Sequence, residues 1–140
     1  MPRKTKTKTK EPLWIDGRDA LAIHGRVLAL HGGAAGVRDQ TLLESGVARP
    51  RQHHAYAASA DIIEMAALYA AGIVRNHPFV DGNKRTGFVI GVLFLELHGF
   101  VFTASEEDAI QAVIALAASA LDEAAFAAWL RENVRRKRGV

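Results

Sequence analysis

The residue types best suited to chemistry in this chain are gathered in one ten-residue stretch, His77 to Thr86, which reads HPFVDGNKRT. The stretch combines a titratable base, a carboxylate, an amide and two cations, and it separates two apolar segments, 62–74 and 87–97. A loop that only reversed the chain direction would need the proline and the glycine, but not the other polar residues. Because an imidazole can take a proton from a hydroxyl group at neutral pH, His77 is the candidate general base.

The two cations of the stretch, Lys84 and Arg85, stand at an unfavourable place if a helix begins near Asn83, because a helix N-terminus already carries partial positive charge. A bound polyanion would remove this conflict. The backbone N–H groups from Gly82 to Arg85 could hold phosphate oxygens, with both side chains adding charge. Gly82 has no Cβ to keep the ligand away. Asp81 is the candidate metal ligand, since Mg²⁺ is often held by one carboxylate, several waters and the phosphates of a nucleotide.

The whole stretch resembles the signature of the Fic/Doc superfamily, and the resemblance extends from about residue 13 to residue 102. Lys84 is similar to the death-on-curing (Doc) toxin branch, whereas Fic enzymes have Gly at that position. Fic enzymes also carry a second Arg three residues after the first, where this chain has Phe88. Both differences favour the Doc branch over the Fic branch.

This resemblance implies a toxin that transfers the terminal phosphate of ATP, with Mg²⁺, to a Ser or Thr hydroxyl of a target protein in the translation machinery, an elongation factor. In the roles that it implies, His77 is the general base and Asp81 binds Mg²⁺ and helps to orient the base. Asn83, Lys84 and Arg85, with the loop N–H groups around Gly82, bind the nucleotide and neutralise charge on the transferred group. Two alternatives stay open: Fic-type transfer of AMP to a protein hydroxyl, and a catalytically silent binding module.

The resemblance also implies a separately encoded antitoxin as partner and a cytoplasmic location. The self-inhibitory segment of the Fic family reads Ser/Thr-x-x-x-Glu-Gly/Asn. The nearest stretch here is Ala128–Asn133, with Ala128 in place of the hydroxyl residue and Glu132 retained. We therefore expect inhibition in trans, by an antitoxin tail, rather than in cis.

Composition predicts one domain, residues 13–136, preceded by a disordered basic tail, residues 1–12. The chain has 140 residues and no cysteine, which excludes disulfides and thiolate chemistry. Its net charge of +3 conceals an uneven distribution: residues 1–10 hold five basic residues and residues 135–138 four more, whereas residues 11–134 hold nine basic and fifteen acidic residues. A solvated tail is favoured over a nucleic-acid contact, because no base-reading module accompanies it, and no apolar run is long enough to indicate a membrane partner.

Hydrophobic periodicity predicts a mainly all-α domain around a central buried helical hairpin. The expected helices are 16–31, a short one after Asp39, 62–75, 83–98, 105–118 and 122–136, with an extended piece at 100–102. Residues 48–56, which contain Pro50, are expected to be irregular or extended, where the resemblance implies a small β-hairpin flap. On the first helix we expect five apolar residues to supply core contacts, namely Leu21, Ile23, Val27, Leu28 and Leu30, and we interpret His24 and His31 as surface or packing residues.

Overall fold

The computed structural model describes residues 11–57 and 59–138, so most of the predicted basic tail lies outside the described residues. In chain order the described part forms α1 (Gly17–His31), α2 (Gln40–Tyr56), α3 (Ile62–Asn76), α4 (Asn83–Leu97), β1 (Phe100–Phe102), α5 (Glu106–Ala117), α6 (Glu123–Glu132) and β2 (Val134–Arg136). This confirms the mainly helical fold class. No helix in this part of the chain is long and apolar enough to cross a membrane.

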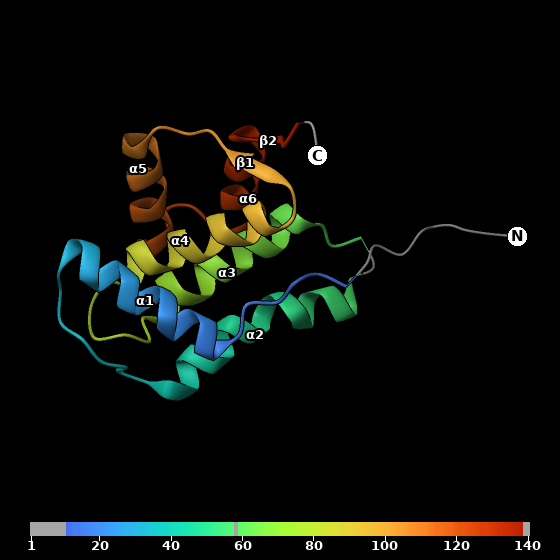
Figure 1. The fold of residues 1–140 in the computed structure, drawn as a ribbon. Helices are drawn as coiled ribbons and strands as arrows, with labels where there is room; N and C mark the ends of the chain where they lie inside the picture. The colour runs from blue at the N-terminus through green and yellow to red at the C-terminus, as the bar shows by residue number, and fades with distance from the viewer. Residues whose placement is uncertain (1–10, 58, 139–140) are drawn as a thin grey trace, which may run out of the picture.

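The antiparallel pair α3 and α4 forms the centre of the fold, with α1 and α2 on one side and α5 and α6 on the other (Figure 1). Helix α3 is buried over nearly its whole length, as its lack of a polar face predicts. The two helices approach closely because α4 presents glycines to α3. A Cβ on Gly87 would lie 2.9 Å from the carbonyl oxygen of Ala70, and one on Gly91 would lie 3.1 Å from that of Ala66. The predicted central hairpin is thus confirmed.

Side-chain caps begin five of the six helices in the described residues. The capping oxygens belong to Asp16, Asp39, Asp61, Ser105 and Asp122, each of which accepts a hydrogen bond from a backbone N–H in the first turn of its helix. The predicted helix starts are confirmed at all five positions. Helix α4 differs, since its N-cap is Gly82 in the left-handed conformation and no side chain caps it.

The prediction for residues 48–56 is wrong. These residues are neither extended nor a flap, because α2 continues through Pro50 to Tyr56. The missing N–H of Pro50 costs one helical hydrogen bond, but Leu43, Val47 and Pro50 itself are buried, and that apolar packing outweighs the loss. The only sheet in the described residues pairs β1 with β2 antiparallel, Phe100 opposite Arg136.

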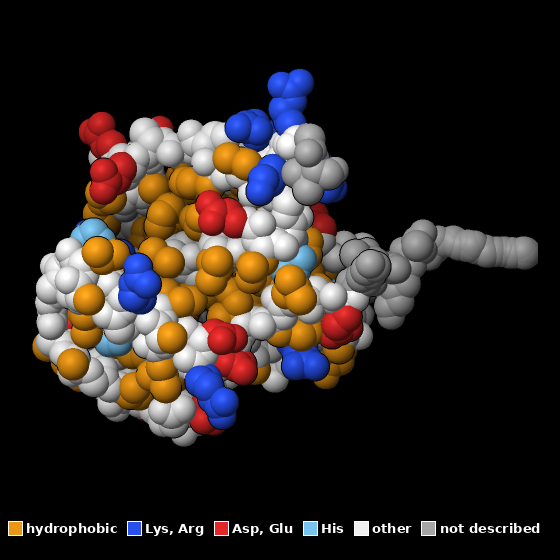
Figure 2. All heavy atoms as spheres, viewed as in Figure 1, with side chains coloured by type: hydrophobic (Ala, Val, Ile, Leu, Met, Phe, Trp, Pro, Cys, Tyr) orange, Lys and Arg blue, Asp and Glu red, His pale blue; other side chains and the backbone are white. Residues whose placement is uncertain are grey.

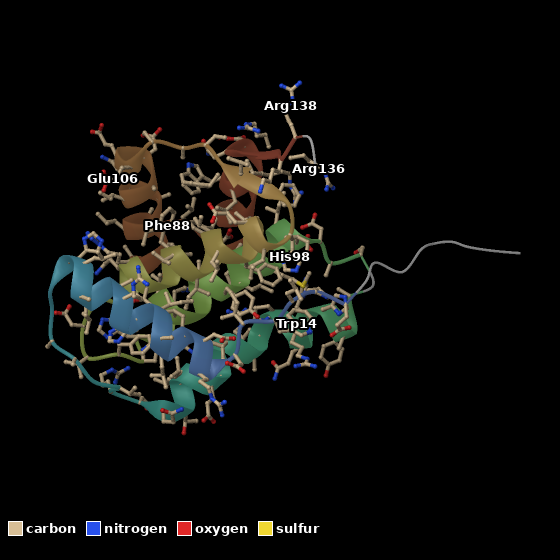
Figure 3. All side chains as sticks on the ribbon, in the orientation of Figure 1. Trp14, Phe88, His98, Glu106, Arg136 and Arg138 are labelled. Carbon is tan, nitrogen blue, oxygen red and sulfur yellow. The ribbon has the colours of Figure 1, made fainter. Side chains whose placement is uncertain are left out.

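The helix expected over residues 122–136 ends at Glu132, and its last three residues form β2 instead. The β1 backbone needs hydrogen-bond partners, and β2 supplies them, extended by a bond from the Thr103 N–H to the Asn133 carbonyl (2.7 Å). The Arg136 guanidinium covers the Phe100 ring at 5.0 Å from its centroid. Arg136 and Arg138 both lie at this end of the molecule (Figure 3).

The buried face of α1 is narrower than predicted. Ala20, His24 and Val27, spaced as one helical stripe, are its buried residues. Leu21 is 41% exposed and Leu30 is 70% exposed, so the expectation that these two supply core contacts is wrong. The apolar residues of α1 are spread around its circumference, and only the stripe that faces the hairpin is covered.

Candidate active site

The motif, residues 77–86, forms the loop between α3 and α4 and the first turn of α4. Helix α3 ends at Asn76, and His77 follows in the left-handed conformation (φ 57°, ψ 52°). Phe79 is completely buried and anchors the loop in the core. The Asn83 side chain closes the loop, because its Oδ1 accepts from the Phe79 N–H at 2.9 Å and its Nδ2 donates to the Phe79 carbonyl at 3.0 Å. The Asn83 amide is therefore used to shape the loop, which leaves its backbone N–H for a ligand.

The start of α4 offers backbone donors. Its first hydrogen bond in the helical pattern runs from the Thr86 N–H to the Gly82 carbonyl (2.9 Å), so the N–H groups of Asn83, Lys84 and Arg85 have no partner within the helix. The side chains of Lys84 and Arg85 are exposed in this first turn. Positive charge and free donors thus coincide at one point, which is the arrangement that binds phosphate groups.

Asp81 is an exposed carboxylate held by two backbone donors. Its Oδ2 accepts from the Ala34 N–H at 3.1 Å and its Oδ1 accepts from the Gly82 N–H at 2.8 Å. These two hydrogen bonds lower the pKa of Asp81 below its usual value, with smaller contributions from the rings of His24 and His77. The carboxylate is therefore ionised at neutral pH.

The residues around Asp81 fit Mg²⁺ only if the ion takes most of its ligands from water and phosphate. In the described residues no group of three or more His, Cys, Asp and Glu side chains comes together, so the protein does not form a metal cage by itself. Each Asp81 oxygen keeps acceptor capacity beside its backbone bond. A single carboxylate next to a phosphate site suits Mg²⁺, which takes its remaining ligands from water and phosphate.

A cleft of about 730 Å³ opens beside the motif, between α1, α4 and α5. One side of it is polar and contains His77, Asp81, Lys84 and Arg85, together with the backbone around Gly82. The structure thus brings all of the predicted site residues to one cavity, whose size is typical of a small-molecule site.

Apolar residues of α4, β1 and α5 form one wall of the cleft. Phe88 points from α4 towards α5 (Figure 3) and meets Phe102 edge to face, with ring centroids 5.4 Å apart. Ile110 and Ile114 of α5 line the same wall although about half of each residue is exposed. Figure 2 shows hydrophobic side chains gathered on this face between α4 and α5.

Comparison with known proteins identifies the family. The model of the Fic/DOC family matches residues 14–95, which include α1 to α3, most of α4 and the motif. This chain belongs to the Fic/DOC family. It is 32% identical to the protein kinase doc of Escherichia phage P1 over 85 residues, which are 61% of this chain and 68% of that relative. It is 41% identical to the toxin Doc of Mycolicibacterium smegmatis over 70 residues, which are 49% of this chain and 53% of that relative.

Within the Fic/DOC family the two relatives place this chain on the death-on-curing branch, which confirms the resemblance seen in the motif. The chain spans about half the length of the mycobacterial relative. The family match ends in α4, so α5 and the apolar wall that it contributes lie outside it.

Two histidines of α1 lie beside the motif, one in contact with its loop and one on the cleft, and the sequence pattern did not predict either place. His24 is buried; its Nε2 lies 2.8 Å from the Asp81 carbonyl oxygen, and its ring stacks on Phe79 with centroids 3.8 Å apart. His31, at the end of α1, lines the cleft. The expectation of a packing role holds for His24, but the residue packs against the motif loop itself. The helical spacing of Ala20, His24 and Val27 was the feature of the sequence that could have indicated His24 on the buried face of α1.

Proposed function

We propose that this chain is a Doc-like toxin that transfers the terminal phosphate of ATP to a Ser or Thr hydroxyl of a target protein, an elongation factor of translation. The observation that carries the proposal is the uncapped start of α4, where exposed Lys84 and Arg85 stand beside His77 and Asp81 on one cleft. Without a polyanion, two cations at that place would destabilise the helix. The relatives add support, since one is named a protein kinase and the other a toxin.

In this mechanism the His77 imidazole takes the proton of the target hydroxyl. The hydroxyl oxygen forms a bond to the terminal phosphorus, and the bond from that phosphorus to the bridging oxygen of ADP breaks. Lys84, Arg85 and the backbone N–H groups at the start of α4 stabilise charge on the transferred group and on ADP. Asp81 is the residue that would hold Mg²⁺, which when bound neutralises phosphate charge. Removal of His77 is expected to lower the rate by roughly 10²–10⁴-fold.

Two residues favour phosphate transfer over AMP transfer. The Lys84 side chain adds a point charge in the first turn of α4, where Fic enzymes have Gly, and it occupies space that a diphosphate would need. Phe88 supplies no charge at the place of the second Arg of Fic enzymes, and its ring is part of the apolar wall. A toxin of this kind would act in the cytoplasm, on its translation target, and be controlled by a cognate antitoxin.

The proposal is tested by incubating the purified chain with ATP, Mg²⁺ and a bacterial lysate, followed by intact-mass analysis of the modified protein. The expected product is an elongation factor that carries one added phosphate on Ser or Thr. His77→Ala should remove this product. His53→Ala is the matched control, because His53 is a partly exposed histidine of α2 that pairs with Glu64 away from the cleft. An added AMP would overturn the proposal in favour of Fic-type chemistry, and the absence of any adduct would favour a silent binding module.

A further inference from the structure

The backbone of His77 is held in the left-handed conformation (φ 57°, ψ 52°), which is uncommon for residues other than glycine. In the described residues, His77 and Ser119 are the two non-glycine residues with positive φ. Helices often end in this left-handed conformation, but usually with glycine. A non-glycine residue persists in this conformation when surrounding contacts over-determine it. The contacts that hold His77 therefore decide where the candidate base stands.

Arg38 makes those contacts with the carbonyls at the end of α3. Its Nε donates to the His77 carbonyl at 2.7 Å and its Nη2 donates to the Asn76 carbonyl at 3.0 Å. The Arg38 backbone N–H also donates to the next carbonyl, that of Pro78, at 2.6 Å. One residue thus bonds three successive carbonyls. The guanidinium also lies at a helix C-terminus, where the helix dipole favours a cation.

The rest of the segment around Arg38 follows the motif loop in the antiparallel direction. We name residues 32–39 the clamp segment. Val37 forms an isolated antiparallel bridge with Phe79, and the Val80 N–H donates to the Gly36 carbonyl at 3.0 Å. The Ala34 N–H reaches the Asp81 carboxylate. The clamp segment therefore contacts the motif loop from His77 to Asp81, with Arg38 at the end nearest the candidate base.

We propose that Arg38 is a positioning residue that fixes His77 for catalysis through the paired bonds from its guanidinium to the carbonyls of Asn76 and His77. Arg38 is not among the described residues that line the cleft, so it acts through His77 rather than on the substrate. A planar fork is needed, because the ammonium of a lysine is a point charge that cannot match both carbonyls in the same way. The catalytic part of this inference rests on the proposed phosphate transfer, whereas its geometric part does not.

The geometric part is tested by NMR on Arg38→Met and Arg38→Lys. Both variants should shift the backbone ¹³C resonances of Asn76 and His77 and should speed amide exchange at Val80. The matched control is Arg131→Met, since Arg131 is likewise exposed and pairs with Asp61, the N-cap of the same helix α3, at 3.0 Å. The control should leave the His77 resonances in place. Unchanged His77 resonances in both Arg38 variants would overturn the inference, whatever the activity of the protein.

The catalytic part is tested by the kinetics of phosphate transfer. Arg38→Met and Arg38→Lys should both lower kcat by roughly 10- to 100-fold, with KM for ATP nearly unchanged, because the base is misplaced while the phosphate site is intact. In a His77→Ala background, Arg38→Met should cause no further loss. A full additional loss in the double variant, or recovery of kcat by Arg38→Lys, would overturn the positioning role. If the unmodified chain transfers no phosphate at all, the proposed function fails and the NMR comparison alone decides the role of Arg38.

Discussion

Lys84 is the residue that distinguishes the two reactions considered for the motif, transfer of phosphate and transfer of AMP. Catalysis of phosphoryl transfer is mostly positioning and electrostatics, so the phosphorus that lies in line with the target hydroxyl determines the product. With Gly at position 84, a diphosphate could enter the pocket at the start of α4 and leave the α-phosphate facing His77. In the proposed mechanism the ammonium of Lys84 would occupy part of that space and would favour the terminal phosphate at the point of attack.

Lys84→Gly is therefore expected to abolish phosphate transfer. Together with Phe88→Arg, which restores the charge that Fic enzymes carry, it should permit weak transfer of AMP. Phe88 is half-buried and lines the cleft, so an arginine there can extend into open space rather than into the packed core. Intact-mass analysis of the target protein reports the result, with Phe88→Arg alone as the control. Phosphate transfer that survives Lys84→Gly would show that Lys84 does not set the orientation of the nucleotide.

Asp81 makes the loop sensitive to acid in a defined direction. Its hydrogen bonds from Ala34 and Gly82 lower its pKa in the folded state. A lowered pKa means that the carboxylate stabilises the fold above the pKa of the unfolded chain, and that this contribution is lost as the pH falls through the folded value. The amide resonances of Ala34 and Gly82 should therefore titrate with a midpoint below the ordinary range of aspartate.

The titration of the Ala34 and Gly82 amides is best followed by NMR in EDTA, so that no metal competes for the carboxylate. Asp81→Asn should remove this titration from both amides, because the asparagine side chain has no carboxyl group to protonate. A midpoint at or above the ordinary range of aspartate would contradict the two hydrogen bonds as the dominant influence on Asp81.

At the scale of elements, the sequence was most informative where local chemistry and burial agree. The caps at Asp16, Asp39, Asp61 and Ser105 precede apolar periodicity, and each predicted a helix start that the structure confirms. Pro50 shows the limit of such local rules, since its cost is local and the packing of α2 that outweighs it is tertiary. Strand β2 could not be predicted for the same reason, because its partner β1 is about thirty residues away in the chain.

The site shows the same division. The spacing of the motif identified the polar residues that the loop and the start of α4 contribute to the cleft. It did not identify Arg38 or His24, which hold the loop, because contacts between α1, the clamp segment and the loop join residues that are far apart in the sequence. The apolar wall from α5 was likewise not predicted. The apolar residues of α5 recur every three to four residues, as in any amphipathic helix. Nothing in that pattern distinguishes a cleft wall from a core face.

The contact between α2 and α3 depends on two glycines. A Cβ on Gly72 would lie 2.6 Å from the Gly46 carbonyl oxygen, which belongs to the backbone and cannot move aside cheaply. Gly72→Ala should therefore destabilise the protein by about 1–3 kcal/mol, as overpacking does. The matched control is Gly25→Ala on the exposed face of α1, where an added Cβ meets no atom within 4 Å.

Urea unfolding separates the effects of these two glycine substitutions. Gly25→Ala should stabilise the protein by roughly 0.5–1 kcal/mol, because alanine loses less conformational entropy than glycine when a helix forms. Stabilisation by Gly72→Ala of similar size would show that α2 and α3 can separate at little cost, and that the close approach of the two glycines is not needed for the fold.

At the scale of the whole molecule, the cleft and helix α6 lie on different parts of the protein surface. The described residues that line the cleft come from α1, α4, β1, α5 and the loops beside them, and none comes from α6. Five residues of α6, among them Ala128 and Arg131, line a separate hollow against α2 and α3, and Arg131 is paired there with Asp61. The segment nearest to a Fic-type inhibitory sequence, Ala128–Asn133, thus lies away from the candidate phosphate site.

This separation supports inhibition in trans. Glu132 is exposed at the end of α6, and the position of the helix-capping hydroxyl in the inhibitory pattern is taken by Ala128. Glu132→Gly should therefore leave the phosphate transfer of the isolated chain unchanged, with Glu132→Ala as a control for fraying of the helix end. A cognate antitoxin, or a peptide from its tail, should suppress transfer by the unmodified chain and by both variants equally. A strong rise in the activity of the isolated chain on Glu132→Gly would mean that the chain restrains itself. The antitoxin would then not be the sole control.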